Sequence, residues 1–548
     1  MPPIPSRGSP ARAAAPRRLF AGTLAATVGV KLLLAARFPV LGDEAYLFTW
    51  AREPAWGYYD HPPLAAWLLQ PFFAAGLGDS LVALRLPSVL LHALLAVGLV
   101  RLLRRSAGPT GGEPAGDARA YLAGTLFLLV PAHVLGVLML TDVPVIACTF
   151  LAGAALFRAE SRPEPGAEEP AAGPRDGGRG GLGGLGWYAA AGVLLGLALL
   201  AKYLAALLAA AFLVWFLSVE KTRRRVLGFS LLVACALPFV LGHLAWNASH
   251  CWSTVLFNVY SRHAGESRNY NVARNLLFYA GAHLYLGGPA LWYLGRRWRR
   301  LAELVRSPGW RAAALAFAVP MALLALSAAL LLFGAYWVLP FYPFLFLLAG
   351  RVLERSELVR CVRFMAVFTG VQALVLAVAV ALPLSAWREA GFFRSLVTMG
   401  RTGEILDRLA PLRGADTRLA ARGYSLASIL SWRSGEPVAV WGEGSHYARQ
   451  DDLWTDWRAA AGGDVLLIDK RPIPEEVFDP YFRRVERRQL RIAGATLHLA
   501  RGHGFDYERY RRRVLARIRD RYYDPPRWLP EWLEGGCPFR ERYFPEAP

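Results

Sequence analysis

The feature that most constrains this chain is a series of apolar runs, most of them about 18 to 22 residues long and with few charged side chains. A helix that crosses the hydrocarbon core of a bilayer needs a run of this length. Of the 548 residues, 55% are hydrophobic and only 19% are charged, which no ordinary soluble protein of this basicity combines. The sequence therefore predicts a mainly α-helical, polytopic membrane protein.

About eleven spans are expected, and two of them are short. They are residues 19–40, 81–103, 121–140, 143–157, 187–201, 204–219, 226–246, 275–294, 312–333, 337–353 and 365–384.

The basic residues predict how these spans are oriented. The net charge is +21, but cytoplasmic loops of membrane proteins carry excess Arg and Lys, so the charge does not indicate nucleic acid. If the spans alternate, the arginines at 101–105, 223–225, 296–300 and 351–363 fall on one side, which we assign to the cytoplasm. No nucleic-acid partner is expected, and the bilayer itself is the expected environment.

The composition changes after about residue 385. Residues 402–412 and 451–461 have helical periodicity, whereas residues 437–441 and 464–468 are short buried-strand runs. We expect a transmembrane domain over residues 1–385 and a small soluble α/β domain over residues 386–548. With eleven spans and the N-terminus inside, this second domain lies outside the cytoplasm.

The five cysteines show neither a CxxC motif nor regular spacing. This pattern disfavours both a disulfide framework and a cysteine-based zinc site.

Two carboxylates directly follow the first expected span, at Asp43 and Glu44. The same outer loop continues to Tyr58, Asp60 and His61. One interpretation is structural: Asp43 caps a helix in the membrane interface, which Trp and Tyr side chains anchor. The other interpretation is that these carboxylates take part in catalysis.

Further outer turns also carry polar side chains, each with a structural alternative. Asp142 can cap a helix, Lys202 can snorkel to the surface, and Tyr342 can belong to an aromatic belt. The fourth outer loop contains His263 and Arg268 and can simply be solvated. Because all five turns bring such groups to one face, we predict a catalytic or headgroup-binding site there.

Five sequence motifs resemble those of bacterial GT-C glycosyltransferases. The resemblance is to the family of protein O-mannosyltransferases and the aminoarabinose lipid A transferase. The motifs are Asp43-Glu44-Ala45-Tyr46, residues 58–63 (YYDHPP), residues 141–144 (TDVP), residues 196–203 (GLALLAKY) and residues 337–343 (WVLPFYP). Residues 424–428 and 452–454 extend the resemblance toward the C-terminus.

The resemblance implies the GT-C fold and an activity. The activity is transfer of a sugar from a polyprenyl-phosphate donor to an extracytoplasmic acceptor, which is an envelope lipid, glycan or protein. It also implies a multi-pass protein of the bacterial inner (cell) membrane. The reaction expected is a direct inverting displacement in which a carboxylate deprotonates the acceptor.

The resemblance also implies roles for individual residues. The candidate catalytic carboxylates are Asp43, Glu44 and Asp142, with Asp43 matching the proposed base. The residues expected to bind the donor phosphate are His61, Lys202, Arg268, Tyr58 and Tyr342. His61 stands where the lipid A enzyme has a lysine, so a permanent cation becomes a titratable one.

The resemblance suggests a divalent metal as a cofactor, with Asp60 and His263 as its candidate ligands. The alternative is that Asp60 accepts a hydrogen bond from His263 or Arg268 without any ion.

Two other classes of protein fit parts of the pattern. A transporter or flippase of lipid-linked sugars also binds headgroups near the membrane surface, but mid-membrane charges or repeated halves are not evident. An assembly protein leaves the three outer carboxylates Asp43, Asp60 and Asp142 unexplained.

Overall fold

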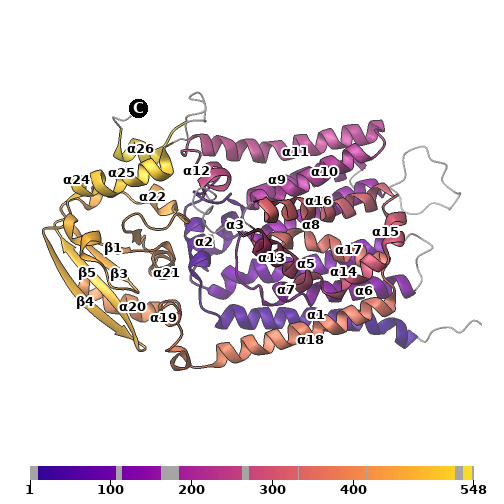
Figure 1. The fold of residues 1–548 in the computed structure, drawn as a ribbon, viewed down its shortest axis with the longest axis horizontal. Coiled ribbons are helices and arrows are strands. Elements are labelled where there is room, and N and C mark those ends of the chain that lie inside the picture. The colour runs from indigo at the N-terminus through magenta and orange to yellow at the C-terminus, as the bar shows by residue number, and fades with distance from the viewer. Residues whose placement is uncertain are drawn as a thin grey trace, which may run out of the picture. The chain divides into compact units, whose positions relative to one another are not determined.

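The structure is a computed structural model that describes residues 10–106, 114–161, 184–261, 271–330, 333–414, 416–524 and 535–545. The chain forms two compact units, and each is described here by itself (Figure 1). The first unit comprises residues 1–35, 85–241 and 270–376. The second unit comprises residues 36–84, 242–269 and 377–548.

The first unit consists of helices. They are α1 (Pro10–Arg37), α5 (Leu81–Arg105), α6 (Pro114–Leu128), α7 (Pro131–Leu135), α8 (Asp142–Glu160), α9 (Gly184–Ala201), α10 (Ala206–Ser218), α11 (Arg223–Ala248), α13 (Val272–Gly287), α14 (Pro289–Arg296), α15 (Trp298–Leu304), α16 (Pro308–Leu330), α17 (Tyr342–Val352) and α18 (Arg355–Ala381), with 3₁₀ turns at Tyr203–Ala205 and Ala335–Phe341. The ends of α1, α5, α11 and α18 extend into the second unit.

Eight helices in the described part of the chain are long and apolar enough to cross a membrane, which agrees with a polytopic fold. The other three expected spans contain shorter helices. The run 275–294 breaks at Gly288, whose φ of 45° suits glycine, and Pro289 then starts α14. The run 121–140 divides between α6 and α7, and α10 has only 13 residues.

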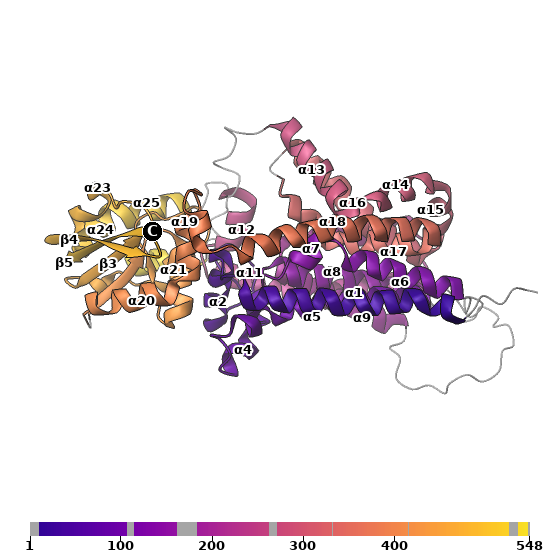
Figure 2. The ribbon, with the colours of Figure 1, turned by 90° about the horizontal axis from the view of Figure 1, so that it is seen from below.

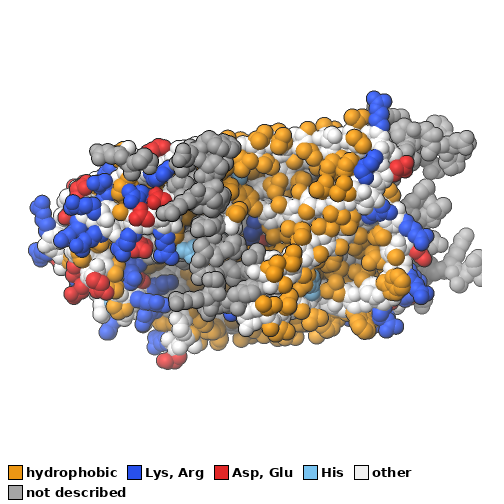
Figure 3. Space-filling model, turned by 45° about the horizontal axis from the view of Figure 1, so that its top comes forward, with side chains coloured by type: hydrophobic (Ala, Val, Ile, Leu, Met, Phe, Trp, Pro, Cys, Tyr) orange, Lys and Arg blue, Asp and Glu red, His pale blue; other side chains and the backbone are white. Residues whose placement is uncertain are grey.

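The first unit has a buried apolar core, and its outer surface is apolar as well. Helix α8 packs against α9 and α16 (Figures 1 and 2). Phe150 and Phe344 meet in the core with their ring centres 5.7 Å apart. Leu277, Leu284 and Leu374 point outward and are 65–73% exposed. Figure 3 shows hydrophobic side chains spread over the visible face of the helices, with Lys and Arg at the end where α15 lies. This surface suits lipid.

The second unit combines short helices with a five-stranded sheet. Its helices are α2 (Gly42–Arg52), α3 (Leu64–Trp67), α4 (Gln70–Ala74), α12 (Ser253–Leu256), α19 (Phe393–Gly400), α20 (Thr402–Leu409), α21 (Tyr424–Ser434), α22 (Gln450–Trp454), α23 (Glu475–Phe478), α24 (Tyr507–Tyr510), α25 (Ala516–Ile518) and α26 (Pro538–Tyr543). Its strands are β1 (Thr417–Ala421), β2 (Ala439–Val440), β3 (Asp464–Asp469), β4 (Arg484–Ile492) and β5 (Ala495–His503).

The strand order is β2-β1-β3-β5-β4, with the first three strands parallel and the last two antiparallel to their neighbours. Strand β3 is buried on both faces: Val465 and Leu467 face one core, and Leu466 and Ile468 the other. Strands β2 and β3 confirm the strands predicted within residues 437–441 and 464–468. The helix expected over 451–461 is shorter than predicted and ends at Trp454.

Candidate active site

Asp43 lies in the first turn of α2, and its carboxylate is exposed. Its Oδ1 accepts a hydrogen bond of 2.6 Å from the hydroxyl of Tyr424, the first residue of α21. The two helices can approach so closely because residue 42 is glycine: a Cβ there would lie 1.8 Å from Oγ of Ser425. Within the described residues no side chain caps α2, so Asp43 does not act as a helix cap there.

Glu44, the other carboxylate of this pair, is fully buried. Neighbouring residues on a helix point in different directions, which separates it from the exposed side of Asp43. Of the two candidates in α2, Asp43 is therefore the one that is exposed to solvent.

Asp60 is 6% exposed and belongs to a hydrogen-bonded network. The hydroxyl of Tyr46 donates to Oδ1 of Asp60 at 3.3 Å, and the same hydroxyl accepts from the backbone N–H of Gln450 at 2.9 Å. Burial, followed by the charge of Asp60, raises the pKa of Tyr46 well above its ordinary value, so this phenol stays a donor. His61 is partly exposed, with Nδ1 3.6 Å from Oδ2 of Asp60.

Two segments far along the chain hold the motif that contains Asp60. The side-chain carbonyl of Gln450 accepts from the backbone N–H of Tyr59 at 2.6 Å. Asn258 donates to the backbone carbonyl of Asp60 at 3.0 Å, and Thr254 donates to that of Tyr58 at 2.6 Å. The loop is thereby fixed from both sides.

Tyr58, a candidate phosphate ligand, is fully buried. Its hydroxyl lies 2.9 Å from the carbonyl oxygen of Trp50 and 3.0 Å from that of Glu53, and its ring stacks on Trp50. Through these two hydrogen bonds, the Tyr58 hydroxyl joins its loop to the end of α2. The geometry therefore favours a structural role for Tyr58.

Two candidate residues, His263 and Arg268, lie outside the described residues. In the described part of the chain, no three His, Cys, Asp or Glu side chains form a group that could hold a metal ion. The metal predicted at Asp60 and His263 remains a prediction, and no chemical step here depends on it.

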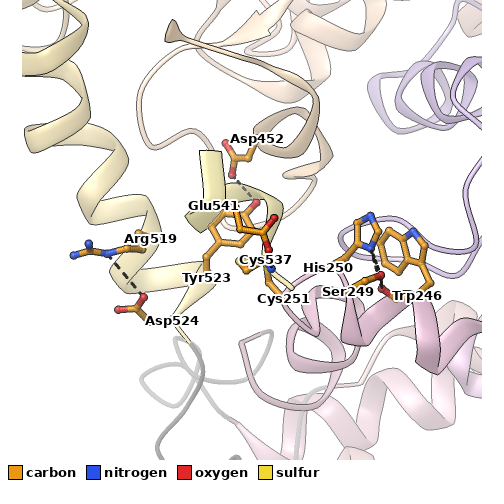
Figure 4. Close-up of a disulfide and its surroundings, with 10 residues drawn as sticks. All are labelled: Trp246, Ser249, His250, Cys251, Asp452, Arg519, Tyr523, Asp524, Cys537 and Glu541. Carbon is orange, nitrogen blue, oxygen red and sulfur yellow. Dashed lines mark hydrogen bonds and ion pairs between the residues drawn. A yellow bond between two sulfur atoms is a disulfide. The ribbon is translucent and has the colours of Figure 1, made fainter. Parts of the chain in front are cut away.

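A disulfide joins Cys251 to Cys537 (Figure 4). Cys251 follows α11, Cys537 precedes α26, and the N–H of Cys251 also donates to the carbonyl of Gly536 at 3.0 Å. The sequence-based argument against disulfides is wrong for this pair. The cysteines are 286 residues apart, so no local spacing signals them.

In the first unit, Asp142 begins α8 and pairs with Lys202 at 2.8 Å. Both side chains are mostly buried, and the Lys202 ammonium also lies 4.6 Å from the ring centre of Tyr336. Thr141 makes no side-chain cap, so capping does not explain this turn. The arrangement provides a cation held by a carboxylate and an aromatic face.

Tyr342 begins α17 and is fully buried in the first unit. Its hydroxyl lies 2.6 Å from Nδ1 of His283. This buried pair places Tyr342 in the helix core, so the geometry favours a packing role over contact with a phosphate.

The hydrogen bonds around Asp43 and Asp60 also involve Tyr424, Tyr46 and Gln450. No role for these three residues was predicted from the sequence. Tyr46 and Tyr424 lie inside motifs that carry the family resemblance, and this was the available signal. The hydrogen bonds that give them a role join residues hundreds of positions apart, which no local pattern reveals.

Comparisons with known proteins agree with this architecture. The sequence model of the dolichyl-phosphate-mannose-protein mannosyltransferase family matches residues 60–167. The lipid A galacturonosyltransferase RgtD of Rhizobium johnstonii is 24% identical over 251 residues, which are 46% of this chain and 47% of that protein. The match thus spans about half the length of this curated relative.

A solved structure is similar over almost its whole length. The apo crystal structure of ArnT from Cupriavidus metallidurans has a TM-score of 0.54 and 15% identity, and the alignment covers 88% of this chain and 97% of ArnT. At this identity the likeness concerns the fold. The chain is therefore a polytopic membrane protein with the GT-C glycosyltransferase fold, similar to ArnT.

Proposed function

We propose that this protein is a glycosyltransferase that moves a sugar from a polyprenyl-phosphate donor to an extracytoplasmic lipid, glycan or protein. The observation that carries the proposal is the exposed carboxylate of Asp43, which lies in the first turn of α2 in a chain with the GT-C fold. The similarity to a protein named lipid A galacturonosyltransferase supports a lipid acceptor among these classes.

The reaction is a single inverting displacement with Asp43 as the base. Asp43 takes the proton of the acceptor hydroxyl while the acceptor oxygen forms a bond to the anomeric carbon. The bond from that carbon to the phosphate oxygen breaks, and its electron pair leaves with the polyprenyl phosphate. Cations stabilise the charge that develops on this leaving group. Lys202 is the described residue best suited to this role, and His61 and Arg268 are further candidates.

The same proposal places the second unit outside the cytoplasm of a bacterial cell, on the outer side of the inner membrane. The disulfide Cys251–Cys537 supports this location, because disulfides persist in oxidising compartments. The arginines in the last turns of α5, α14 and α17 fit the cytoplasmic side.

A deletion strain tests the activity. Mass spectrometry of its envelope lipids and glycans should show one species that lacks a single sugar residue, and polyprenyl-phosphate-linked sugar should accumulate. Wild-type protein should restore the species in the cell. Purified protein reconstituted with lipid extract from the deletion strain should form it in vitro. If reconstituted protein moves the donor across the bilayer without forming a glycosidic bond, the chain is a flippase and the proposal is wrong.

A further inference from the structure

The hydroxyl of Tyr424 makes a hydrogen bond to the candidate base from 381 residues away in the sequence. We propose that Tyr424 is a positioning residue for the transfer reaction: it holds Oδ1 of Asp43, so that Oδ2 is directed at the acceptor hydroxyl. This inference rests on the proposed function, and it means that a residue of the C-terminal part of the chain orients the catalytic base.

The arrangement of hydrogen bonds at Asp43 supports this division of its two oxygens. Oδ1 accepts the 2.6 Å bond from Tyr424, a short distance of the kind seen when the acceptor is charged. Among the described residues, no donor contacts Oδ2. A carboxylate with one oxygen fixed keeps a single orientation, and its other oxygen stays available to take a proton.

The helices that carry the two residues are fixed to one another at both ends. At the start of α2, Gly42 allows close contact with Ser425. At its end, Arg52 donates to the backbone carbonyls of Ser431 and Trp432 at 3.0 and 2.9 Å. The distance between Tyr424 and Asp43 is therefore set by the packing of α2 on α21 and not by flexible side chains alone.

Tyr424 is also chemically suited to remain a donor. Burial, followed by the hydrogen bond to Asp43 and the charge of that carboxylate, raises the pKa of its phenol above the ordinary value. Its ring packs edge-on against Tyr46 with the ring centres 5.6 Å apart. A phenylalanine would keep this ring contact and remove only the hydroxyl.

The test compares purified full-length Tyr424→Phe with wild-type protein and with Tyr507→Phe. Tyr507 is a suitable control because its hydroxyl makes no hydrogen bond to the described residues of the same unit. Losing a hydrogen bond to a charged group costs enough free energy to lower a rate about 10- to 100-fold. We therefore expect kcat of Tyr424→Phe to fall by that factor. KM for the donor and the thermal midpoint should stay close to wild type.

Two further variants separate a positioning role from a structural one. 4-Aminophenylalanine at position 424 keeps a hydrogen-bond donor in place and should restore most of the rate. This rescue is expected even if Tyr424→Phe is less stable than wild-type protein. Adding Tyr424→Phe to Asp43→Asn should cost nothing more, since Tyr424 acts through Asp43. Wild-type kcat in Tyr424→Phe, or an additive loss in the double variant, would overturn the positioning role. Full activity of Asp43→Asn alone would instead overturn the proposed base.

Discussion

The ammonium of Lys202 lies 2.8 Å from Oδ1 of Asp142, and the Tyr336 ring lies 4.6 Å away from it. Lys202 is thus held between a carboxylate and an aromatic face while little of it is exposed to solvent. A phosphate that binds Lys202 must share it with Asp142, so the carboxylate both orients the cation and limits its affinity for the donor.

Lys202→Met should therefore weaken donor use more than Asp142→Asn does. The first change removes the cation, and we expect kcat/KM for the donor to fall by about 10-fold or more, since a buried charge partner is lost. The second change leaves the lysine charged. Lys221→Met, at an exposed lysine, is the control and should behave as wild type. Equal kcat/KM for Lys202→Met and wild type would exclude a donor-binding role for Lys202.

Asp43→Asn should lower transfer by about 100-fold or more, because the amide keeps the shape of the carboxylate but cannot accept the acceptor proton. The thermal midpoint should change little, since Asp43 is exposed. Asp407→Asn, at an exposed carboxylate of α20, is the matched control. Steady-state turnover of purified protein decides the point, and near-normal turnover of Asp43→Asn would remove Asp43 from the mechanism.

The helical architecture could be predicted because burial in lipid imposes long apolar runs, which the sequence displays directly. The break at Gly288 and the division between α6 and α7 were missed, since short helices that pack inside a bundle keep the same apolar composition. Asp43 and Glu44 could be predicted as candidate site residues because they lie in a recognisable motif. Which of Asp43 and Glu44 is exposed depends on how α2 packs against α21, and that contact joins distant segments.

Removing the disulfide should destabilise the second unit. Cys251→Ser/Cys537→Ser should lose roughly 2–4 kcal/mol of stability, because the bond closes a long loop. A reductant should lower the thermal midpoint of wild-type protein but not that of the double variant. Cys235→Ser, at a free cysteine, should match wild type. A midpoint that does not respond to reductant would show that the pair contributes nothing to stability.

Alkylation in intact cells checks the compartment as well. Cys251 and Cys537 should resist a membrane-permeant maleimide until a reductant is added, and a mass shift on gels reports the reaction. Rapid labelling of both cysteines without reductant would mean that the pair is reduced in the cell, which contradicts an oxidising location.

The neighbouring carboxyls Asp451 and Asp452 on α22 have unequal surroundings. Arg449 is 3% exposed and donates to Asp452 through two nitrogens at 2.7 and 2.8 Å. Among the described residues, Asp451 forms no such ion pair. Burial, followed by the negative charge of Asp452, raises the pKa of Asp451 well above its ordinary 3.8. The folded protein therefore holds this proton more tightly than the unfolded chain does.

Asp451→Asn should stabilise the protein at neutral pH. A raised folded pKa gives a contribution that is fully present below about pH 3.8 and is lost as the pH rises through the folded pKa. Asparagine resembles the protonated acid and avoids this loss, so its advantage should grow from about pH 4 upward. Each tenfold difference in proton affinity is worth about 1.4 kcal/mol, or about 3 to 6 °C in the midpoint.

Asp452→Asn is the contrasting variant: it leaves Arg449 buried without its partner and should lower the midpoint. Thermal unfolding of both variants from pH 4 to pH 8 tests the assignment, and an Asp451→Asn midpoint at or below wild type at pH 8 would show that Asp451 is stabilised as the anion.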